Sequence, residues 1–214
     1  MNQPESRQAC GPTASEQDQR SRERLLRAAV DVFDRKGYAA ASVREIVERA
    51  GITKPVLYYH FGSKEGILVA ILEEAARQFQ KAVTRAAQRP GSARERLAAL
   101  CEEIYSLFKQ NVPVVRVAHA VYFGPREGLP PFDFNVFDRT LADALHRIVE
   151  EGMATGELRR APIDYVSTVI NGVIEVCTDQ ELNPHATPVG LDGLHRVLNL
   201  IFEGLVATHE GKEN

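Results

Sequence analysis

The sequence predicts an all-α fold: an N-terminal three-helix domain followed by a larger helical bundle, with about nine helices in total. Three observations predict this fold. Apolar residues recur at helical spacing along most of the chain. No segment alternates apolar and polar residues as a half-buried strand does. Stretches rich in Pro and Gly separate the periodic segments, at 89–92, 124–131 and 183–190.

The N-terminal region begins with a polar segment. Residues 1–19 contain almost no apolar side chains, so we expect a disordered arm there. A helix is expected over 21–36, where two cations precede Gly37, a usual helix end. Ser42 and Glu45 have the spacing of a capping box, which predicts that the next helix begins after Ser42.

That second helix is expected to be short and to end at Gly51. Thr53 is expected to cap a third helix, Lys54 to His60, in which Pro55 stands in the first turn, where proline is tolerated. Further helices are expected at about 64–88, 92–110, 113–123, 134–155, 162–182 and 190–209.

Composition excludes several classes of protein. No apolar run is long enough to span a membrane, and we expect no secretory signal, since the N-terminus has no apolar region. The three cysteines, Cys10, Cys101 and Cys177, are far apart and form no CxxC. This pattern argues against a disulfide framework or a zinc site and favours a reducing, cytoplasmic location. We expect no metal and no cofactor.

The two short helices on either side of Gly51 have the spacing of a helix-turn-helix. Apolar residues can brace the pair from inside, while donors and flat rings lie on the outer face of the second helix: Lys54, Tyr58, Tyr59 and His60. Lys64 and the first N–H groups of the following helix would add a phosphate site. Residues 1–64 also carry 11 Lys and Arg against 8 Asp and Glu, whereas the whole chain has a net charge of −3.

Other interpretations of this pattern remain. Helix pairs with a glycine between them are common in proteins that never touch DNA, and adjacent tyrosines also occur in cores. However, Tyr58 and Tyr59 point about 100° apart on a helix, so both cannot face the same interior.

The stretch from Leu25 to Leu68 resembles the DNA-binding domain of the TetR/AcrR family of bacterial regulators. The resemblance is carried by Ala29, Phe33 and Gly37-Tyr38, by Ser42-Val43-Arg44-Glu45-Ile46, by Ala50-Gly51-Ile52, and by Leu57-Tyr58-Tyr59-His60-Phe61 followed by Ser63-Lys64-Glu65. It covers only this part of the 214 residues, and the C-terminal part shows no subfamily motif.

The resemblance implies which residues meet DNA, with the recognition helix corresponding to Thr53 through His60. Phosphate contacts are implied for Ser42, Arg44, Tyr58, His60 and Lys64. The residues nearest the bases would be Lys54, Pro55 and Val56, and Tyr59 could do either. The family often has Gly or a small polar residue at the positions of Pro55 and Val56, so readout partly by apolar contact and DNA shape is expected here.

The resemblance also implies the domain organisation: a helix-turn-helix domain over 20–66 and a ligand-binding and dimerisation domain over 67–214. The family forms dimers through a four-helix bundle made by the last two helices of each subunit. Apolar stripes in those two segments support this, and the expected interface residues are Val169, Val173, Val176, Leu194, Leu198, Ile201 and Leu205. The alternative is that these stripes form an ordinary intramolecular core.

Aromatic residues are concentrated in the middle of the chain. A pocket for a flat or lipophilic ligand is one interpretation, with Phe79, Phe108, Tyr122, Phe123, Phe134 and Phe137 as lining residues. The other interpretation is that they are plain core residues.

These observations predict a ligand-controlled transcription repressor that binds a palindromic operator in double-stranded DNA as a homodimer. A small lipophilic or aromatic effector would release it, and no membrane would be involved. An enzyme is not expected, because the chain has no nucleophile elbow, P-loop or HExxH motif. A helical interaction protein that merely keeps the N-terminal fold remains as the other alternative.

Overall fold

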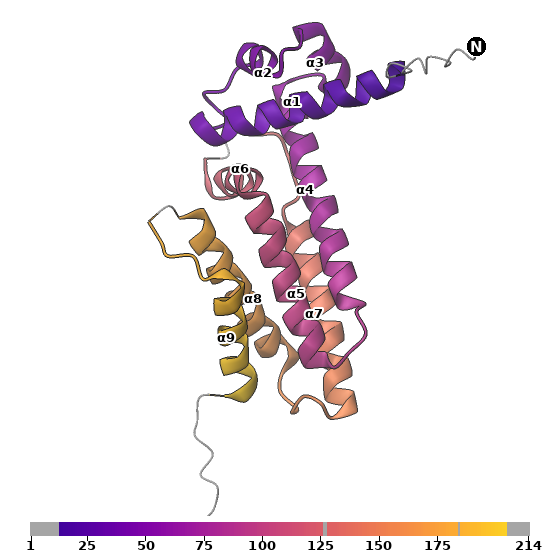
Figure 1. The fold of residues 1–214 in the computed structure, drawn as a ribbon, viewed down its shortest axis with the longest axis vertical. Helices are drawn as coiled ribbons and strands as arrows, with labels where there is room; N and C mark the ends of the chain where they lie inside the picture. Colours follow the sequence, from indigo (N-terminus) through magenta and orange to yellow (C-terminus); the bar gives the residue numbers. More distant parts are fainter. Residues whose placement is uncertain (1–12, 126–127, 184, 205–214) are drawn as a thin grey trace, which may run out of the picture. The chain divides into compact units, whose positions relative to one another are not determined.

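Nine helices and no strand occur among residues 13–125, 128–183 and 185–204, which a computed structural model of the chain describes (Figure 1). The expected all-α fold is therefore confirmed. The first four helices are α1 (Ala14–Lys36), α2 (Val43–Ala50), α3 (Lys54–Phe61) and α4 (Lys64–Ala87). The others are α5 (Ala93–Gln110), α6 (Val112–Phe123), α7 (Asn135–Thr155), α8 (Ile163–Leu182) and α9 (Gly190–Glu203).

The chain divides into two compact units, and the division falls within α4, between Ile71 and Leu72. The first unit contains the described residues up to Ile71, together with Pro125 and residues 128–130. The second unit contains the other described residues. The boundary expected between residues 66 and 67 lies in the same helix.

Helix α1 begins at Ala14 rather than at Ser21. The Glu16 N–H donates to the hydroxyl of Thr13, and the Thr13 N–H donates to the Glu16 carboxylate at 2.7 Å, which is a capping box. Residues 14–19, expected to belong to a disordered arm, are therefore helical. The remainder of the expected arm, residues 1–12, lies outside the described residues.

Helices α1, α2 and α3 pack around one small core in the first unit. Leu25 and Ala29 of α1, Ile46 of α2 and Leu57 of α3 are completely buried there. Their burial removes apolar surface from water and holds the two short helices, which are too short to be stable alone. This core fixes which face of α3 remains exposed.

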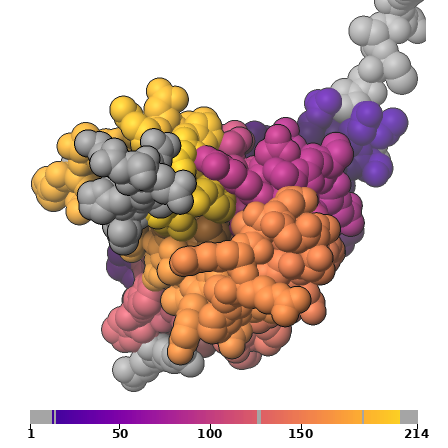
Figure 2. Space-filling model, turned by 90° about the horizontal axis from the view of Figure 1, so that it is seen from below, coloured from indigo at the N-terminus to yellow at the C-terminus, as the bar shows by residue number. Residues whose placement is uncertain are grey.

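Helix α5 lies at the centre of the second unit, where it packs against α6, α7, α8 and α9. Leu97, Leu100 and Ile104 on α5 are completely buried. At one end of this unit, the Arg94 guanidinium of α5 donates to the Asn199 side chain of α9 at 3.0 Å. Figure 2 shows this end, with the magenta segment that includes the start of α5 beside the yellow α9.

Helix α9 ends earlier than the expected 209. It ends at Glu203, where Gly204 adopts a φ of +80° that a non-glycine residue rarely takes. Within the described part of the chain, no helix combines the length and apolar character needed to cross a membrane.

Candidate nucleic-acid interface

The turn between α2 and α3 is fixed from two sides. Gly51 ends α2 with a φ of +61°, in the left-handed region. The Arg24 guanidinium of α1 donates to the carbonyl oxygens of Ala50 at 2.5 Å and of Gly51 at 3.4 Å. A cation at this position satisfies carbonyl groups that α2 itself leaves free, and it opposes the negative end of the helix dipole.

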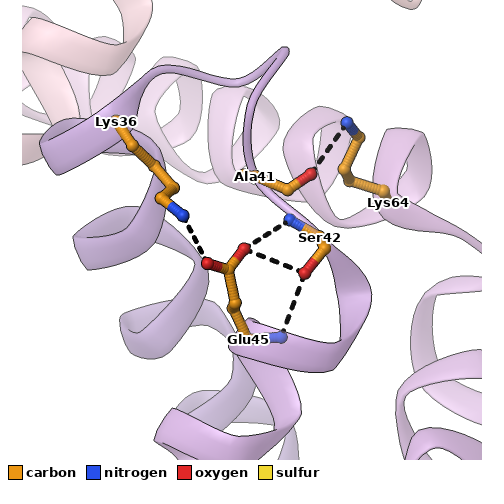
Figure 3. Close-up of polar contacts among 5 residues, drawn as sticks. All are labelled: Lys36, Ala41, Ser42, Glu45 and Lys64. Atoms are coloured by element: carbon orange, nitrogen blue, oxygen red, sulfur yellow. Dashed lines mark hydrogen bonds and ion pairs between the residues drawn. The ribbon is translucent and has the colours of Figure 1, made fainter.

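The start of α2 is fixed by a second set of contacts around Glu45 (Figure 3). The Glu45 N–H donates to the Ser42 hydroxyl, and the Ser42 N–H donates to the Glu45 carboxylate at 3.0 Å, which confirms the expected capping box. The Lys36 ammonium of α1 donates to the same carboxylate. Together with an ion pair between Asp31 and Arg49, these contacts fasten α2 to α1 at both of its ends.

Helix α3 therefore buries one side and presents the other. Leu57 is completely buried, whereas Tyr58 is 50% and Tyr59 is 77% exposed. Thr53, Lys54 and Pro55 are exposed as well. We call the exposed residues Lys54, Pro55, Tyr58 and Tyr59 the outer face of α3.

The polar groups at this face are available. In the described part of the chain, no hydrogen bond or ion pair involves the side chains of Lys54 or Tyr58. Thr53 is the N-cap of α3, as expected, but it makes no side-chain capping bond, so its hydroxyl is not used there. Val56, expected near the bases with Pro55, is half-buried.

Two further residues expected at phosphates are exposed but already have partners. Ser42 uses its hydroxyl in the capping box with Glu45. The Arg44 guanidinium donates to Glu48 at 2.6 Å on the surface of α2. An exposed ion pair of this kind contributes little free energy, so the Arg44 guanidinium can exchange Glu48 for another anion at small cost.

Lys64, at the start of α4, has a structural role that the sequence did not indicate. Its ammonium donates to the carbonyl oxygens of Tyr38 and Ala41, both at 3.1 Å, and lies 4.3 Å from the centre of the Tyr38 ring. The Tyr38 hydroxyl in turn donates to Glu65 at 3.1 Å. Burial, and to a smaller extent the nearby Glu65 carboxylate, raises the pKa of Tyr38 to about 12, so the Tyr38 hydroxyl stays protonated. Two of the three ammonium hydrogens of Lys64 are thus occupied, and one remains for a phosphate.

His60 does not have the position expected for a phosphate contact. Its side chain is only 5% exposed, and its Nε2 lies 3.5 Å from the Asp18 carboxylate of α1. It lies in the last turn of α3, on the side that packs against α1. The sequence interpretation placed His60 on the outer face with Lys54, and the structure corrects this.

The interface expected in the second unit is only partly at the surface. Leu194 and Leu198 are completely buried or nearly so and belong to the core of the unit, so their assignment to an intersubunit face is corrected. Val169 and Val176 are about half exposed, while Val173 and Ile201 are half-buried. Leu205 lies outside the described residues. Exposed apolar residues on these two helices that the sequence interpretation missed are Tyr165 and Leu200.

Ring contacts link all six residues of the expected pocket. The buried Phe79 contacts Phe108 and Phe137 at centroid distances of 6.3 and 5.4 Å. The centre of the Phe137 ring lies 6.5 Å from that of Phe134, and the centre of the Phe134 ring lies 5.2 Å from that of Tyr122. Tyr122 contacts the exposed Phe123 at 4.7 Å. We call these six residues the aromatic series, which runs from the core of the second unit to its surface.

The described residues contain no group of three or more His, Cys, Asp or Glu side chains that could hold a metal ion. Cys101 and Cys177 are buried and unpaired. Burial raises the pKa of the Cys101 thiol to about 12, which keeps it in the unreactive protonated form.

The first unit can thus offer an ammonium group, two phenol rings and their hydroxyls on one rigid helix. Such groups contact phosphates and the base edges of a major groove. Two short helices joined by a tight turn, with the second helix exposed, define this unit as a helix-turn-helix domain.

Comparison with known proteins agrees with this class. The model of the bacterial regulatory proteins of the tetR family matches residues 25–71. The helix-turn-helix domain of this chain, over these residues, is thus of the tetR-family type. The match covers α3 and the contacts around Glu45 and Lys64, but not the first turns of α1.

Two curated relatives align with limited parts of the chain. The HTH-type transcriptional activator FasR of Mycolicibacterium smegmatis is 38% identical over 90 residues, which are 42% of this chain and 41% of FasR. The A-factor receptor protein of Streptomyces griseus is 50% identical over 50 residues, 23% of this chain and 18% of the receptor. The chain thus spans less than half the length of either relative.

A solved structure extends the similarity over both units. The transcriptional regulator FadR from Bacillus subtilis, in complex with stearoyl-CoA, superposes with a TM-score of 0.65 and 22% sequence identity. The match covers 86% of this chain and 99% of FadR. At this identity the similarity establishes the shared fold.

The contacts of Glu45 make the stability of the fold depend on pH. Hydrogen bonds from the Lys36 ammonium, and to a smaller extent from Ser42, lower the pKa of Glu45 from 4.5 to about 2. A carboxylate whose pKa is lowered by folding stabilises the fold above its unfolded pKa, and this contribution is lost as the pH falls through the folded pKa.

We therefore expect the free energy of unfolding to fall between about pH 4.5 and pH 2, and to fall less in Glu45→Gln. Glutamine at this position preserves the capping box but removes the charge. Urea unfolding across this pH range measures the difference. Lys36→Gln should reduce the dependence in the same way, and an unchanged pH dependence in Glu45→Gln would contradict the assignment.

Proposed function

We propose that the protein is a ligand-responsive DNA-binding transcription regulator that acts as a repressor at a palindromic operator. The observation that carries the proposal is the outer face of α3, where Lys54, Tyr58 and Tyr59 are exposed while Leu57 anchors the helix from behind. Lys54 and Tyr58 are one helical turn apart, so both can enter the same groove.

A DNA fragment from upstream of the protein's own gene tests this proposal by fluorescence anisotropy at two salt concentrations. The affinity should fall steeply with salt, because bound cations release counterions from phosphates. If Lys54 contacts a base, Lys54→Ala should weaken binding by about 1–3 kcal/mol. If Lys54 contacts a phosphate, the slope of the logarithm of the binding constant against the logarithm of the salt concentration (the salt slope) should decrease by about 1. Tyr59→Ala should weaken binding as well.

Lys81→Ala is the matched control, because it removes the same charge from an exposed position on α4 in the second unit. It should bind DNA like the wild type. Equal affinity of Lys54→Ala, Tyr59→Ala and the wild type would overturn the proposal. Transcription in vitro from the same fragment should fall when the protein is added, whereas an increase would identify an activator, as FasR is named.

We also propose that a second copy of the chain covers the exposed apolar residues of α8. Tyr165, Val169 and Val176 recur at spacings of four and seven residues, so they share one side of the helix. Val169 is 49% and Val176 is 57% exposed. Apolar stripes of this kind on a monomer are typical of helix-bundle interfaces between subunits. Two-fold symmetry of such a dimer requires a palindromic operator, with half-sites about 34–36 Å apart or a multiple of this.

Val176→Glu should convert the dimer to a monomer in size-exclusion chromatography with light scattering, because a buried unpaired charge is costly. Its circular dichroism should remain that of the wild type, since the side chain is exposed within the subunit. The control is Asn171→Glu, which places the same charge on an exposed position on another side of α8. A Val176→Glu dimer of unchanged stability would exclude this face.

The effector we propose is a lipophilic molecule that binds along the aromatic series. The series is continuous from the buried Phe79 to the exposed Phe123, so an apolar ligand could contact it from the surface inward. Aromatic side chains contribute large apolar areas to such sites. The similarity in fold to FadR, whose structure contains stearoyl-CoA, supports an acyl chain as the first probe.

Stearoyl-CoA should therefore release the wild-type protein from DNA. Tyr122→Ala should bind DNA normally but need about tenfold more stearoyl-CoA, since a loss of about 1.4 kcal/mol changes affinity tenfold. Lys81→Ala, which removes an exposed side chain outside the series and outside α8, is again the control. If Tyr122→Ala and Lys81→Ala both respond to stearoyl-CoA like the wild type, the series is not the effector site.

A further inference from the structure

The imidazole of His60 is buried without a hydrogen bond that would satisfy it. The side chain is 5% exposed, and its Nε2 is fully buried and has no hydrogen-bond partner. The Asp18 carboxylate lies 3.5 Å from Nε2, at the limit of hydrogen-bond distance, and forms no hydrogen bond with it. Buried polar atoms normally have a partner, so this atom calls for an explanation.

The charged groups around His60 come from α1. Asp18 is half exposed and faces Nε2, and the Arg22 guanidinium, one turn further along α1, lies 5.4 Å from the centre of the Phe61 ring. Within α3 the neighbours of His60 are the rings of Tyr59 and Phe61. The charged side chains of α2, which also packs against α3, are paired elsewhere: Arg44 with Glu48, Glu45 with Lys36, and Arg49 with Asp31.

Asp18 lies outside the part of the chain that the tetR family model matches, which begins at residue 25. It belongs to the first turns of α1, which are helical because Thr13 and Glu16 form a capping box. These turns bring Asp18 to the end of α3. The contact therefore joins a residue outside the matched segment, Asp18, to a residue within it, His60.

We propose that Asp18 and His60 form a proton-dependent pair that positions the recognition helix α3 against α1, so that the affinity for DNA increases when His60 is protonated. This inference rests on the proposed DNA-binding function. Histidine changes charge between about pH 5 and 8, and only the protonated ring offers an N–H on both nitrogens. An imidazolium would donate from Nε2 to Asp18 as a charge-assisted hydrogen bond. Its charge would also be favoured in the last turn of α3, at the negative end of the helix dipole.

The consequence for DNA follows from the position of His60 in the chain. Tyr59 precedes it directly, and Lys54 and Tyr58 lie on the same short helix. Fixing the last turn of α3 against α1 therefore fixes the direction of the outer face. His60 and Asp18 act as positioning residues and do not touch DNA.

The experiment measures the dissociation constant for the operator fragment from pH 5.5 to 8 at constant ionic strength. The wild-type affinity should fall about two- to fivefold as the pH rises, the range expected for a partly exposed ion pair. Asp18→Asn and His60→Gln should each remove this part of the pH dependence, and the double variant should resemble either single variant. Glu23→Gln, which removes a negative charge from the exposed side of α1, should keep the wild-type profile.

Two outcomes would overturn the inference. One is a wild-type pH profile in Asp18→Asn. The other is a loss of pH dependence in His60→Gln alone, with a salt slope reduced by about 1, which would make His60 a phosphate contact.

Hydrogen exchange of the free protein separates this inference from the proposed function. The protection factors of the amides in the last turn of α3 should be higher at pH 6 than at pH 8 in the wild type and equal in Asp18→Asn. If the wild type fails to bind DNA at every pH, the DNA-binding proposal fails. The exchange measurement still decides whether the pair exists, and equal protection in the wild type at both pH values would reject it.

Discussion

The arrangement of the first unit depends on the turn at Gly51. A residue with a Cβ would be strained there by about 1–2 kcal/mol, because left-handed backbone brings Cβ against the following carbonyl. The turn sets the angle at which α3 leaves α2, and the Arg24 guanidinium holds its carbonyl groups from α1. Leu57 then faces the core, and Tyr59 consequently faces outward. The whole outer face of α3 follows from this geometry.

Most of the helical architecture could be predicted because its signals are local. Ser42 and Glu45 lie within one turn of each other, and their spacing alone indicated where α2 begins. The same spacing occurs at Thr13 and Glu16, but no apolar periodicity follows it until Leu25. The polar composition of residues 1–19 therefore predicted a disordered arm where α1 in fact begins.

The candidate site was less predictable, because its contacts join distant parts of the chain. Lys64 bonds carbonyl groups that lie 23 and 26 residues away, and Arg24 bonds a carbonyl 26 residues away. Periodicity identified the apolar stripe containing Leu194, but a stripe does not reveal whether the same subunit or another one covers it. His60 was misplaced for a similar reason, since its environment is created by turns of α1 that sequence reasoning left disordered.

Pro55, in the first turn of α3, has a consequence for the kinetics of recognition. Its ring fixes φ near the helical value and restricts the unfolded chain, so α3 loses less conformational entropy when it forms. An eight-residue helix would otherwise be marginal in water. Because the helix is ordered before any encounter with a binding partner, association need not wait for a folding step. For the DNA-binding function proposed above, discrimination between sequences would then depend mainly on the lifetime of each complex.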